Sequence, residues 1–189
     1  ATPVTLSGRL LDPEGNPIAN QLVRLDSGSS QVYDYTDSAG NYEIQVAPGE
    51  YYIRVNQSAN PSNAPSYYYL YSDNKVSLTT STTLDIILPT KKVTVQVQDP
   101  DGNPVAGVSV TSSYVHNSSL YMGTIPANGS TQQNSPVTTD GSGLATMWLY
   151  PGTYTFTATP PSESPYAQTN TTQVISSDAT VPATLATPC

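Results

Sequence analysis

The feature that most constrains this chain is a set of turn motifs that occurs twice. Residues 12–20 begin with Asp-Pro-Glu-Gly-Asn-Pro, and residues 99–107 begin with Asp-Pro-Asp-Gly-Asn-Pro. An Asp-x-x-Gly element then begins at Asp37 and again at Asp140, and a Pro-Gly-x-Tyr element follows each of them. Pro presets one backbone dihedral, and Gly and Asn tolerate positive φ, so these elements predict tight turns. The chain must therefore adopt a fold that places the same turns twice.

The two copies differ in length between their first and second turn elements. Asp12 and Asp99 are 87 residues apart, whereas Asp37 and Asp140 are 103 residues apart. The second copy therefore carries 16 additional residues, which we place within 112–137. We expect them to form an inserted loop, and loops carry function more often than cores do.

Short alternations of apolar and polar residues lie between the turns. They are clearest in residues 6–10, 42–46 and 51–55 of the first copy and in residues 93–97 of the second. Residues two apart in a strand point to the same side, so this pattern predicts half-buried strands. No segment shows an apolar stripe with the helical period. Many short strands between Gly and Pro turns predict an all-β protein of two tandem antiparallel β-sandwich domains, residues 1–89 and 90–189.

The repeated turn elements resemble those of the carboxypeptidase regulatory-like family, which has a prealbumin-like (transthyretin-like, Ig-like) sandwich and is related to collagen-adhesin B-type repeats. The second copy departs from the family pattern at Ala145, where the first copy has an aromatic residue. The resemblance implies a scaffold, as found in accessory domains of secreted enzymes, in stalks of surface adhesins and in modules thought to bind carbohydrate. It is carried by the following segments: 12–20, 36–42 and 48–51, then 99–107, 139–145 and 151–154.

Composition argues against several classes of function. The formal net charge is -8 and only six residues are basic, which disfavours nucleic acid as a partner. No apolar run approaches the roughly 18 residues that a membrane helix needs. The single histidine argues against a histidine metal site and a histidine-assisted active site, so we expect no enzymatic activity and no cofactor. The single cysteine, Cys189, cannot form an internal disulfide. We expect it to mark a chain cut from a longer protein, and a free or intermolecular thiol is the alternative. The chain does not open with a signal-peptide pattern, so we expect any signal peptide to be already removed.

Tyrosines are the main candidates for a ligand-binding surface. In a strand, Tyr67, Tyr69 and Tyr71 would share one face, and Tyr68 would share the other with Leu70. One set would fill the core and the other would present aromatic rings with hydroxyl groups, which suits contact with sugars or with proteins. Cross-strand packing is the alternative role for these rings. The full candidate set is Tyr33, Tyr35, Tyr67, Tyr68, Tyr69 and Tyr71.

Carboxylates in the first turn of each copy are candidate calcium ligands, because Ca²⁺ binds six to eight oxygen atoms. These residues are Asp12 and Glu14, and Asp99 and Asp101. The turns lack the distal bidentate Glu of an EF-hand loop. The alternative is that Asp12 and Asp99 accept backbone hydrogen bonds and cap their turns.

Four Asn-x-Ser/Thr sequons begin at Asn56, Asn117, Asn128 and Asn170. They predict N-glycosylation only in a source that modifies secreted proteins.

The insertion also contains His116, and one histidine makes a poor metal site.

We expect a non-catalytic extracellular or cell-surface module, such as a spacer, an adhesin segment or a filament building block. Its partners would be other protein domains or copies of itself, with neither nucleic acid binding nor membrane insertion. The alternative is a carbohydrate-binding accessory module of a secreted enzyme, in which the Tyr67–Tyr71 face binds glycans.

Overall fold

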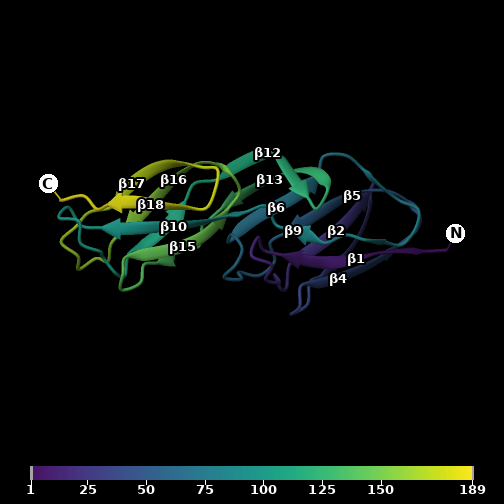
Figure 1. Ribbon diagram of the computed structural model, residues 1–189, viewed down its shortest axis with the longest axis horizontal. Coiled ribbons are helices and arrows are strands. Elements are labelled where there is room, and N and C mark those ends of the chain that lie inside the picture. Colours follow the sequence, from purple (N-terminus) through teal and green to yellow (C-terminus); the bar gives the residue numbers. More distant parts are fainter. Residues whose placement is uncertain (1, 189) are drawn as a thin grey trace. The chain divides into compact units, whose positions relative to one another are not determined.

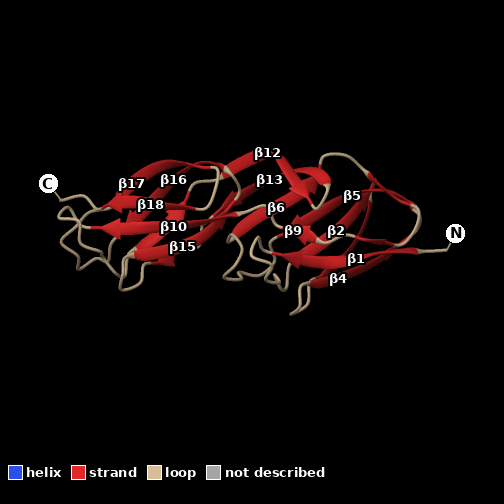
Figure 2. Cartoon of the chain, viewed as in Figure 1, coloured by secondary structure: helices blue, strands red, loops and turns tan. Residues whose placement is uncertain are grey.

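A computed structural model describes residues 2–188, so Cys189 lies outside the described residues. These residues form strands joined by turns and loops, without a helix (Figure 1, Figure 2). They therefore include no helix that could span a membrane. The predicted all-β sandwich class is confirmed. The chain divides into two compact units: unit 1 contains the residues through Thr90 together with His116–Ser130, and unit 2 contains Lys91–Val115 together with the residues from Thr131 onward.

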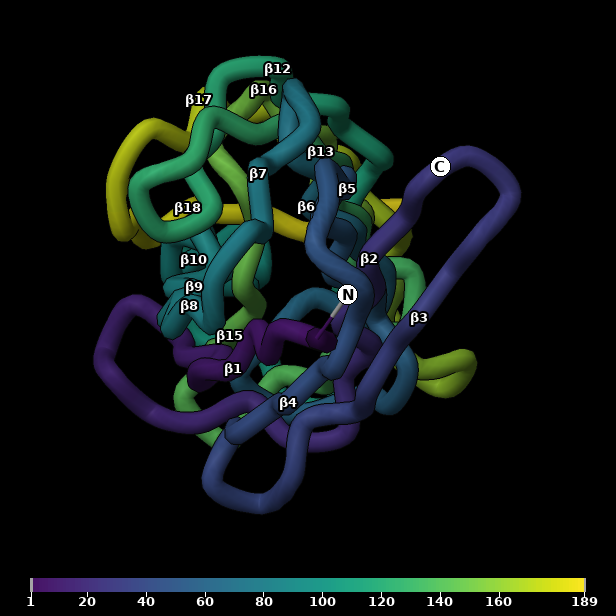
Figure 3. Tube along the Cα trace, turned by 90° about the vertical axis from the view of Figure 1, so that its right-hand side faces the viewer, coloured from purple at the N-terminus to yellow at the C-terminus, as the bar shows by residue number. Residues whose placement is uncertain are grey.

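Unit 1 is built from two sheets. One has the order β4-β1-β8, and β9 also pairs with β1; β1 is antiparallel to β4 and parallel to β8 and β9 (Figure 3). The other has the order β12-β13-β6-β5-β2-β3, with β7 paired to β5. The strands are β1 (Val4–Leu11), β2 (Leu22–Ser27), β3 (Ser30–Tyr35), β4 (Asn41–Val46), β5 (Gly49–Asn56), β6 (Tyr67–Ser72), β7 (Val76–Leu78), β8 (Thr82–Thr83), β9 (Ile86–Ile87), β12 (Val115–Met122) and β13 (Ile125–Gln132).

The core of unit 1 follows from the alternation of apolar residues in its strands. Every second residue of β4 is buried, and so is every second residue in the middle of β2 and β5. Burying a large apolar side chain stabilises the fold by roughly 1.5–3 kcal/mol relative to leaving it exposed. The largest fully buried side chains of the unit include Tyr68, Leu6, Leu10, Ile18, Leu25, Ile44, Ile53, Leu70 and Leu78.

Unit 2 repeats this arrangement with fewer strands. Its sheets have the orders β15-β10-β18 and β14-β11-β16-β17, and β10 is antiparallel to β15 and parallel to β18. Its core contains valines of β10 and the rings of Tyr154 and Phe156. The strands are β10 (Lys91–Gln98), β11 (Ser109–Ser112), β14 (Val137–Thr138), β15 (Leu144–Leu149), β16 (Gly152–Thr159), β17 (Thr169–Ile175) and β18 (Ala179–Thr184).

The Asp-x-x-Gly turns require glycine in both units. Gly40 has φ +79° and Gly143 has φ +76°, a region that other residues seldom adopt. A Cβ atom at Gly40 would lie 2.6 Å from the carbonyl oxygen of Leu10, and one at Gly143 would lie 2.5 Å from that of Val97. The turn thus packs against the first strand of each unit, which explains why the motif recurs.

The additional residues of the second copy form a hairpin rather than a loop. Strands β12 and β13 follow one another, and β13 lies next to β6 in the larger sheet of unit 1 (Figure 1). Residues 116–130 therefore belong to unit 1, and the prediction of an inserted loop within a domain 90–189 was wrong. The hairpin is ordered by long-range packing, because it buries Leu120, Met122 and Ala127.

Polar contacts attach the hairpin to β6 and the turn after it. The backbone N–H of Asp73 donates to the carbonyl oxygen of Pro126 at 3.0 Å. The Nδ2 of Asn128 donates to Asp73 Oδ1 at 2.9 Å and to the carbonyl oxygen of Tyr71 at 3.3 Å. The hairpin consequently covers an edge of β6 that would otherwise be open.

Candidate functional site

The tyrosine run forms β6, and its residues alternate between two environments as predicted. Tyr68 and Leu70 are buried, and the Tyr68 hydroxyl donates to Gln21 Oε1 at 2.7 Å. Burial raises the pKa of Tyr68 far above its usual range. The prediction of Tyr68 as a ligand-binding residue was therefore wrong, because this set of side chains fills the core.

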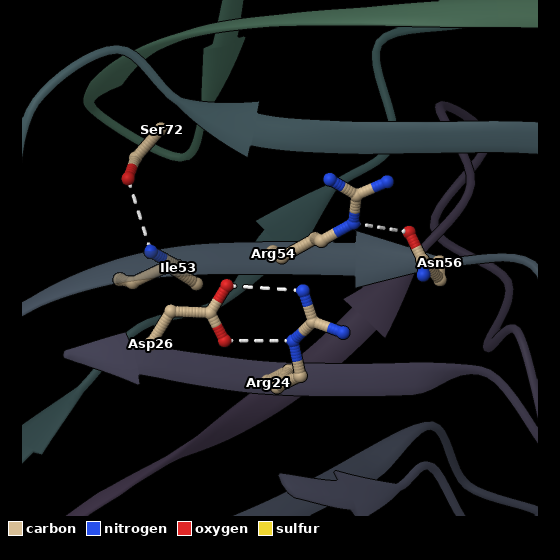
Figure 4. A network of polar contacts seen from close by, with 6 residues as sticks. All are labelled: Arg24, Asp26, Ile53, Arg54, Asn56 and Ser72. Atoms are coloured by element: carbon tan, nitrogen blue, oxygen red, sulfur yellow. Dashed lines mark hydrogen bonds and ion pairs between the residues drawn. The ribbon is translucent and has the colours of Figure 1, made fainter. Parts of the chain in front are cut away.

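The other set, Tyr67, Tyr69 and Tyr71, is half-buried. Arg54 lies opposite Tyr71 in the register of β5 and β6. Its Cζ atom is 4.7 Å from the centroid of the Tyr69 ring and 5.4 Å from that of Tyr71. Its Nε donates to Asn56 Oδ1 at 2.8 Å and fixes the guanidinium plane (Figure 4). The arginine is thus held against two aromatic rings that attract a cation.

Strand β2 adds an ion pair to the same face of the sheet. Arg24 lies opposite Arg54 in register, and it donates to the two carboxylate oxygens of Asp26 at 2.7 and 3.0 Å (Figure 4). Asp26 therefore balances the charge of Arg24. Burial, followed by the negative charge of Asp26, raises the pKa of Tyr71, so its hydroxyl group stays protonated and can donate a hydrogen bond.

Further rings extend this face along β5 and onto the edge strand β3. The Tyr52 ring lies 5.4 Å from that of Tyr71, and Lys75 Nζ lies 5.8 Å from the Tyr52 centroid. On β3, Tyr33 and Tyr35 are 57% and 50% exposed and make an edge-to-face pair at 5.8 Å. We call the following set the Tyr–Arg face, with Lys75 at its border: Tyr33, Tyr35, Arg24, Asp26, Tyr52, Arg54, Tyr69 and Tyr71.

The corresponding face of unit 2 is neutral. Thr111 and Thr157 occupy the positions of Arg24 and Arg54, and they face each other in the same register. Thr157 Oγ1 donates to Asn170 Oδ1 at 3.0 Å, within a row of such polar contacts. The shared backbone therefore does not require tyrosine and arginine on this face.

A groove of about 680 Å³ lies on the other sheet of unit 1. Tyr35 lines it, so the groove meets the Tyr–Arg face at this residue. Four carboxylates and one guanidinium group also line what we call the acidic groove, namely Asp34, Asp37, Glu43, Asp85 and Arg9.

The groove lies where the strand ladder beside β1 is interrupted. Strand β1 pairs with β8 and then with β9, and Leu84 and Asp85 separate these two strands. A Cβ atom at Gly8 would lie 1.9 Å from the carbonyl oxygen of Leu84, so only glycine leaves room for this approach. The Tyr42 hydroxyl donates to that oxygen at 2.5 Å, and Asp85 Oδ1 accepts the Arg9 N–H at 3.0 Å. The polar groups at the interruption are thus satisfied, as in a β-bulge.

Besides Asp85, two further groove carboxylates are held by backbone groups. Asp34 accepts the N–H of Tyr35 at 2.8 Å and that of Glu43 at 2.9 Å. It therefore satisfies one backbone donor on each of the edge strands β3 and β4. Asp37 accepts the N–H of Asn41 at 2.9 Å. The Asn41 hydrogen bond, despite the opposing effect of desolvation, lowers the pKa of Asp37 below its ordinary value of 3.8.

The predicted calcium ligand Asp12 serves its own turn. Its Oδ1 accepts the N–H of Glu14 at 2.8 Å and that of Asn16 at 3.0 Å. Its Oδ2 accepts from Asn63 Nδ2 at 3.0 Å. The capping role predicted for Asp12 is therefore confirmed.

Asp99 has the same role in unit 2. Its Oδ1 accepts the N–H of Asp101 at 2.9 Å and that of Asn103 at 3.0 Å, and the Tyr166 hydroxyl donates to its Oδ2 at 3.3 Å. The Asn103 hydrogen bond is the main cause that lowers the pKa of Asp99. Across residues 2–188, no three histidine, cysteine or acidic side chains gather in a way that could hold a metal ion, so the calcium prediction finds no ligand set there.

The sequon asparagines differ in accessibility, and their glycosylation stays a prediction. Asn170 is exposed, whereas Asn56, Asn117 and Asn128 are half-buried. The Nδ2 of Asn128, to which a glycan would attach, donates the hydrogen bonds that hold the hairpin.

The single histidine lies on β12 and contacts the Tyr–Arg face. Its Nδ1 is 2.9 Å from Ser130 Oγ and 3.2 Å from the Tyr69 hydroxyl. Ser130 is fully buried, so this Ser–His contact gives a substrate no access to the serine hydroxyl. The contact of His116 with Tyr69 was missed because the sequence carries no sign that the insertion pairs with β6.

Known proteins resemble parts of this chain. A stretch of 53 residues, or 28% of the chain, is 45% identical to Structural protein 27 of His-1 virus (isolate Australia/Victoria) and covers 10% of that protein. The chain thus spans only a small part of the length of this relative.

Among solved structures, the shaft pilin SpaA from Lactobacillus rhamnosus GG is 13% identical, with a TM-score of 0.46 and coverage of 100% of this chain and 98% of the pilin. The minor pilin GBS52 of Streptococcus agalactiae is 18% identical, with a TM-score of 0.45 and coverage of 98% and 97%. The family model of the carboxypeptidase regulatory-like domain matches residues 5–89, which is the first copy of the repeat.

Proposed function

We propose that this chain is a non-catalytic structural and interaction module outside the cell, in which unit 1 contacts partners and unit 2 acts as a spacer. The observation that carries the proposal is the difference between the Tyr–Arg face of unit 1 and the neutral threonine face of unit 2 at corresponding positions. Since the fold does not need tyrosine and arginine there, we attribute these residues to the binding of partners.

The chemistry of the Tyr–Arg face supports a role in binding other proteins. Tyrosine and arginine are enriched among the residues that contribute most to interface affinity. Arg54 is already oriented by Asn56 and by two rings, so less side-chain entropy is lost when a partner binds. The partners are other copies of this chain or other protein domains.

Two observations support a structural rather than an enzymatic role. His116 approaches the hydroxyl of Ser130, which is buried, and that of Tyr69, which belongs to the Tyr–Arg face. The viral relative with 45% identity over 53 residues is named a structural protein.

Sedimentation velocity from micromolar to millimolar concentration tests the proposal. We expect the mean mass to rise with concentration. We also expect Tyr33→Ser together with Tyr35→Ser to reduce this rise, because both rings are exposed. Serine substitutions at the exposed positions Tyr114 and Tyr121, outside the face, are the control. A chain that stays monomeric throughout would contradict self-association.

Carbohydrate binding is the second candidate function. The exposed ring of Tyr35 lines a polar groove, and the exposed ring of Tyr33 packs edge-to-face against it. This arrangement can stack on a sugar and accept hydrogen bonds from its hydroxyl groups. A glycan array tests this candidate. It requires a bound glycan whose signal falls when Tyr33 and Tyr35 are replaced by alanine, and an array without signal would reject it.

A further inference from the structure

We infer that the acidic groove of one copy receives Arg54 and Lys75 from the Tyr–Arg face and its border on another copy. The inference rests on the proposed function and names the two surfaces through which the copies would associate. Both surfaces belong to unit 1, and each carries the charge that the other lacks.

The positive surface is formed by Arg54 and Lys75. Arg54 donates a hydrogen bond only from Nε, so its two terminal nitrogens have no acceptor among the described residues. Lys75 is exposed and makes no ion pair within the described part of the chain. Arg24 is neutralised by Asp26, so Arg54 and Lys75 hold the free positive charge of the face.

The negative surface is formed by Glu43 and Asp85 together with Asp37. The Glu43 carboxylate and the second carboxylate oxygen of Asp85 have no hydrogen-bond partner among residues 2–188. Arg9 is the one cation of the groove, and its Nε donates to the carbonyl oxygen of Ala39. The acidic groove therefore keeps a net negative charge in a concave site, where charge is most effective in attracting a cation.

The fold does not require this charge. In unit 2, Gln96 and Thr146 occupy the positions of Arg9 and Glu43, and they lie on the same paired strands. A smaller groove of unit 2 is lined by Lys92 and Asp178, which carry opposite charges. The acidic groove is therefore a property of unit 1 rather than of the sandwich.

A second copy is the occupant that the charges favour. Only six residues of the chain are basic, and two that make no ion pair within the described part of the chain, Arg54 and Lys75, lie at the Tyr–Arg face. In unit 2, Lys92 already lies over the Trp148 ring at 5.6 Å. Since the groove and the face are different surfaces of one unit, their contact is heterologous and can repeat from copy to copy.

Charge exchange tests the inference in the full chain. We expect Lys75→Glu and Glu43→Lys each to weaken association about tenfold or more in sedimentation velocity at low salt. Combining both substitutions in one chain should restore it, because the exchanged charges again attract.

Matched substitutions at corresponding or nearby positions of unit 2 serve as controls. Thr146→Lys places a lysine at the position of Glu43, and Thr157→Glu places a glutamate on the neutral face. Neither should change association. Lys75 and Glu43 are exposed, so their variants are expected to fold, and circular dichroism would verify this.

The outcomes separate the interface from the proposed function. Association of the wild type that neither charge reversal weakens would overturn the interface and leave self-association intact. Weakening by each reversal without restoration in the double variant would also overturn the direct contact. A wild-type chain that is monomeric at every concentration would overturn self-association and the interface together.

Discussion

Gly8 faces Tyr42 across the first sheet of unit 1, whereas Val95 faces Ala145 at the corresponding place in unit 2. In unit 1 the missing side chain of Gly8 admits the carbonyl oxygen of Leu84, and the Tyr42 hydroxyl satisfies it. In unit 2 the valine and alanine leave the ladder between β10 and β18 continuous. The two units thus differ in side-chain volume at this one cross-strand pair. The parallel ladder beside it is interrupted in unit 1 and unbroken in unit 2.

The two units also differ on the outer faces of their larger sheets, although their inner faces are alike. Buried positions of both units hold apolar residues, because the two sheets of each unit pack on them. The outer positions carry tyrosine and arginine in unit 1 and threonine in unit 2. Folding constrains the inner face, so the outer face is where two copies of one fold can acquire different functions.

The largest effect is expected from the two methionines of the chain. Met122 of the hairpin is 0% exposed and Met147 of unit 2 is 2% exposed. We expect Met122→Ala to cost about 2–5 kcal/mol through lost packing and the cavity left behind. Hydrogen exchange should show lower protection of β6 in unit 1, and Met147→Ala should instead lower that of β10 in unit 2. Loss of protection in unit 2 on changing Met122 would contradict the assignment of the hairpin to unit 1.

Gly8→Ala is expected to destabilise unit 1 by about 1–3 kcal/mol, because the new Cβ atom would collide with the Leu84 carbonyl and force the backbone to move. Thermal unfolding would measure the loss. The control is Val95→Ala, which removes packing from unit 2 but forces no collision there. A Gly8→Ala chain of wild-type stability would mean that Leu84 does not approach β1 as described.

Acid sensitivity should be separable between the units through Asp37 and Asp99. Both carboxylates have a pKa below the ordinary 3.8 in the folded chain. Each therefore contributes stability that is present above 3.8 and is lost as the pH falls through the folded-state pKa. We expect Asp37→Asn to flatten the acid-induced loss of stability in unit 1, and Asp99→Asn in unit 2. The difference between the denaturant midpoints at about pH 5 and about pH 2 would measure this loss of stability for the wild type and each variant. A difference that is the same in the wild type and the variants would contradict the prediction.

The smallest effect is expected from the ion pair of the Tyr–Arg face. The side chains of Arg24 and Asp26 are 21% and 13% exposed. Arg24→Thr and Asp26→Ser install the residues that unit 2 has at these positions, Thr111 and Ser113. A double-mutant cycle should give a coupling of about 0.2–1 kcal/mol, as for other partly exposed pairs. A coupling of several kcal/mol would show that the ion pair stabilises the sheet rather than balancing charge.

The sequence predicted the features that depend on neighbouring residues. The turns at Asp12 and Asp37 follow from Pro, Gly and Asx chemistry, and the burial of Tyr68 beside the half-buried Tyr69 follows from the period of a strand. The acidic groove was missed. It depends on the meeting of Gly8, Tyr42 and Leu84, and Leu84 is distant from the other two in the sequence.

By itself, the sequence determined two sets of turns and alternating strands, and hence an all-β chain with a repeated plan. It did so because turn dihedrals and strand alternation are set by residues close together in the chain. Only the tertiary structure decided that residues 116–130 of the second copy complete the larger sheet of unit 1. The pairing of β13 with β6 joins strands more than 50 residues apart, and open backbone groups on β6 accept any strand of suitable length and side-chain fit. That choice is made by long-range packing, for which the local pattern carries no signal.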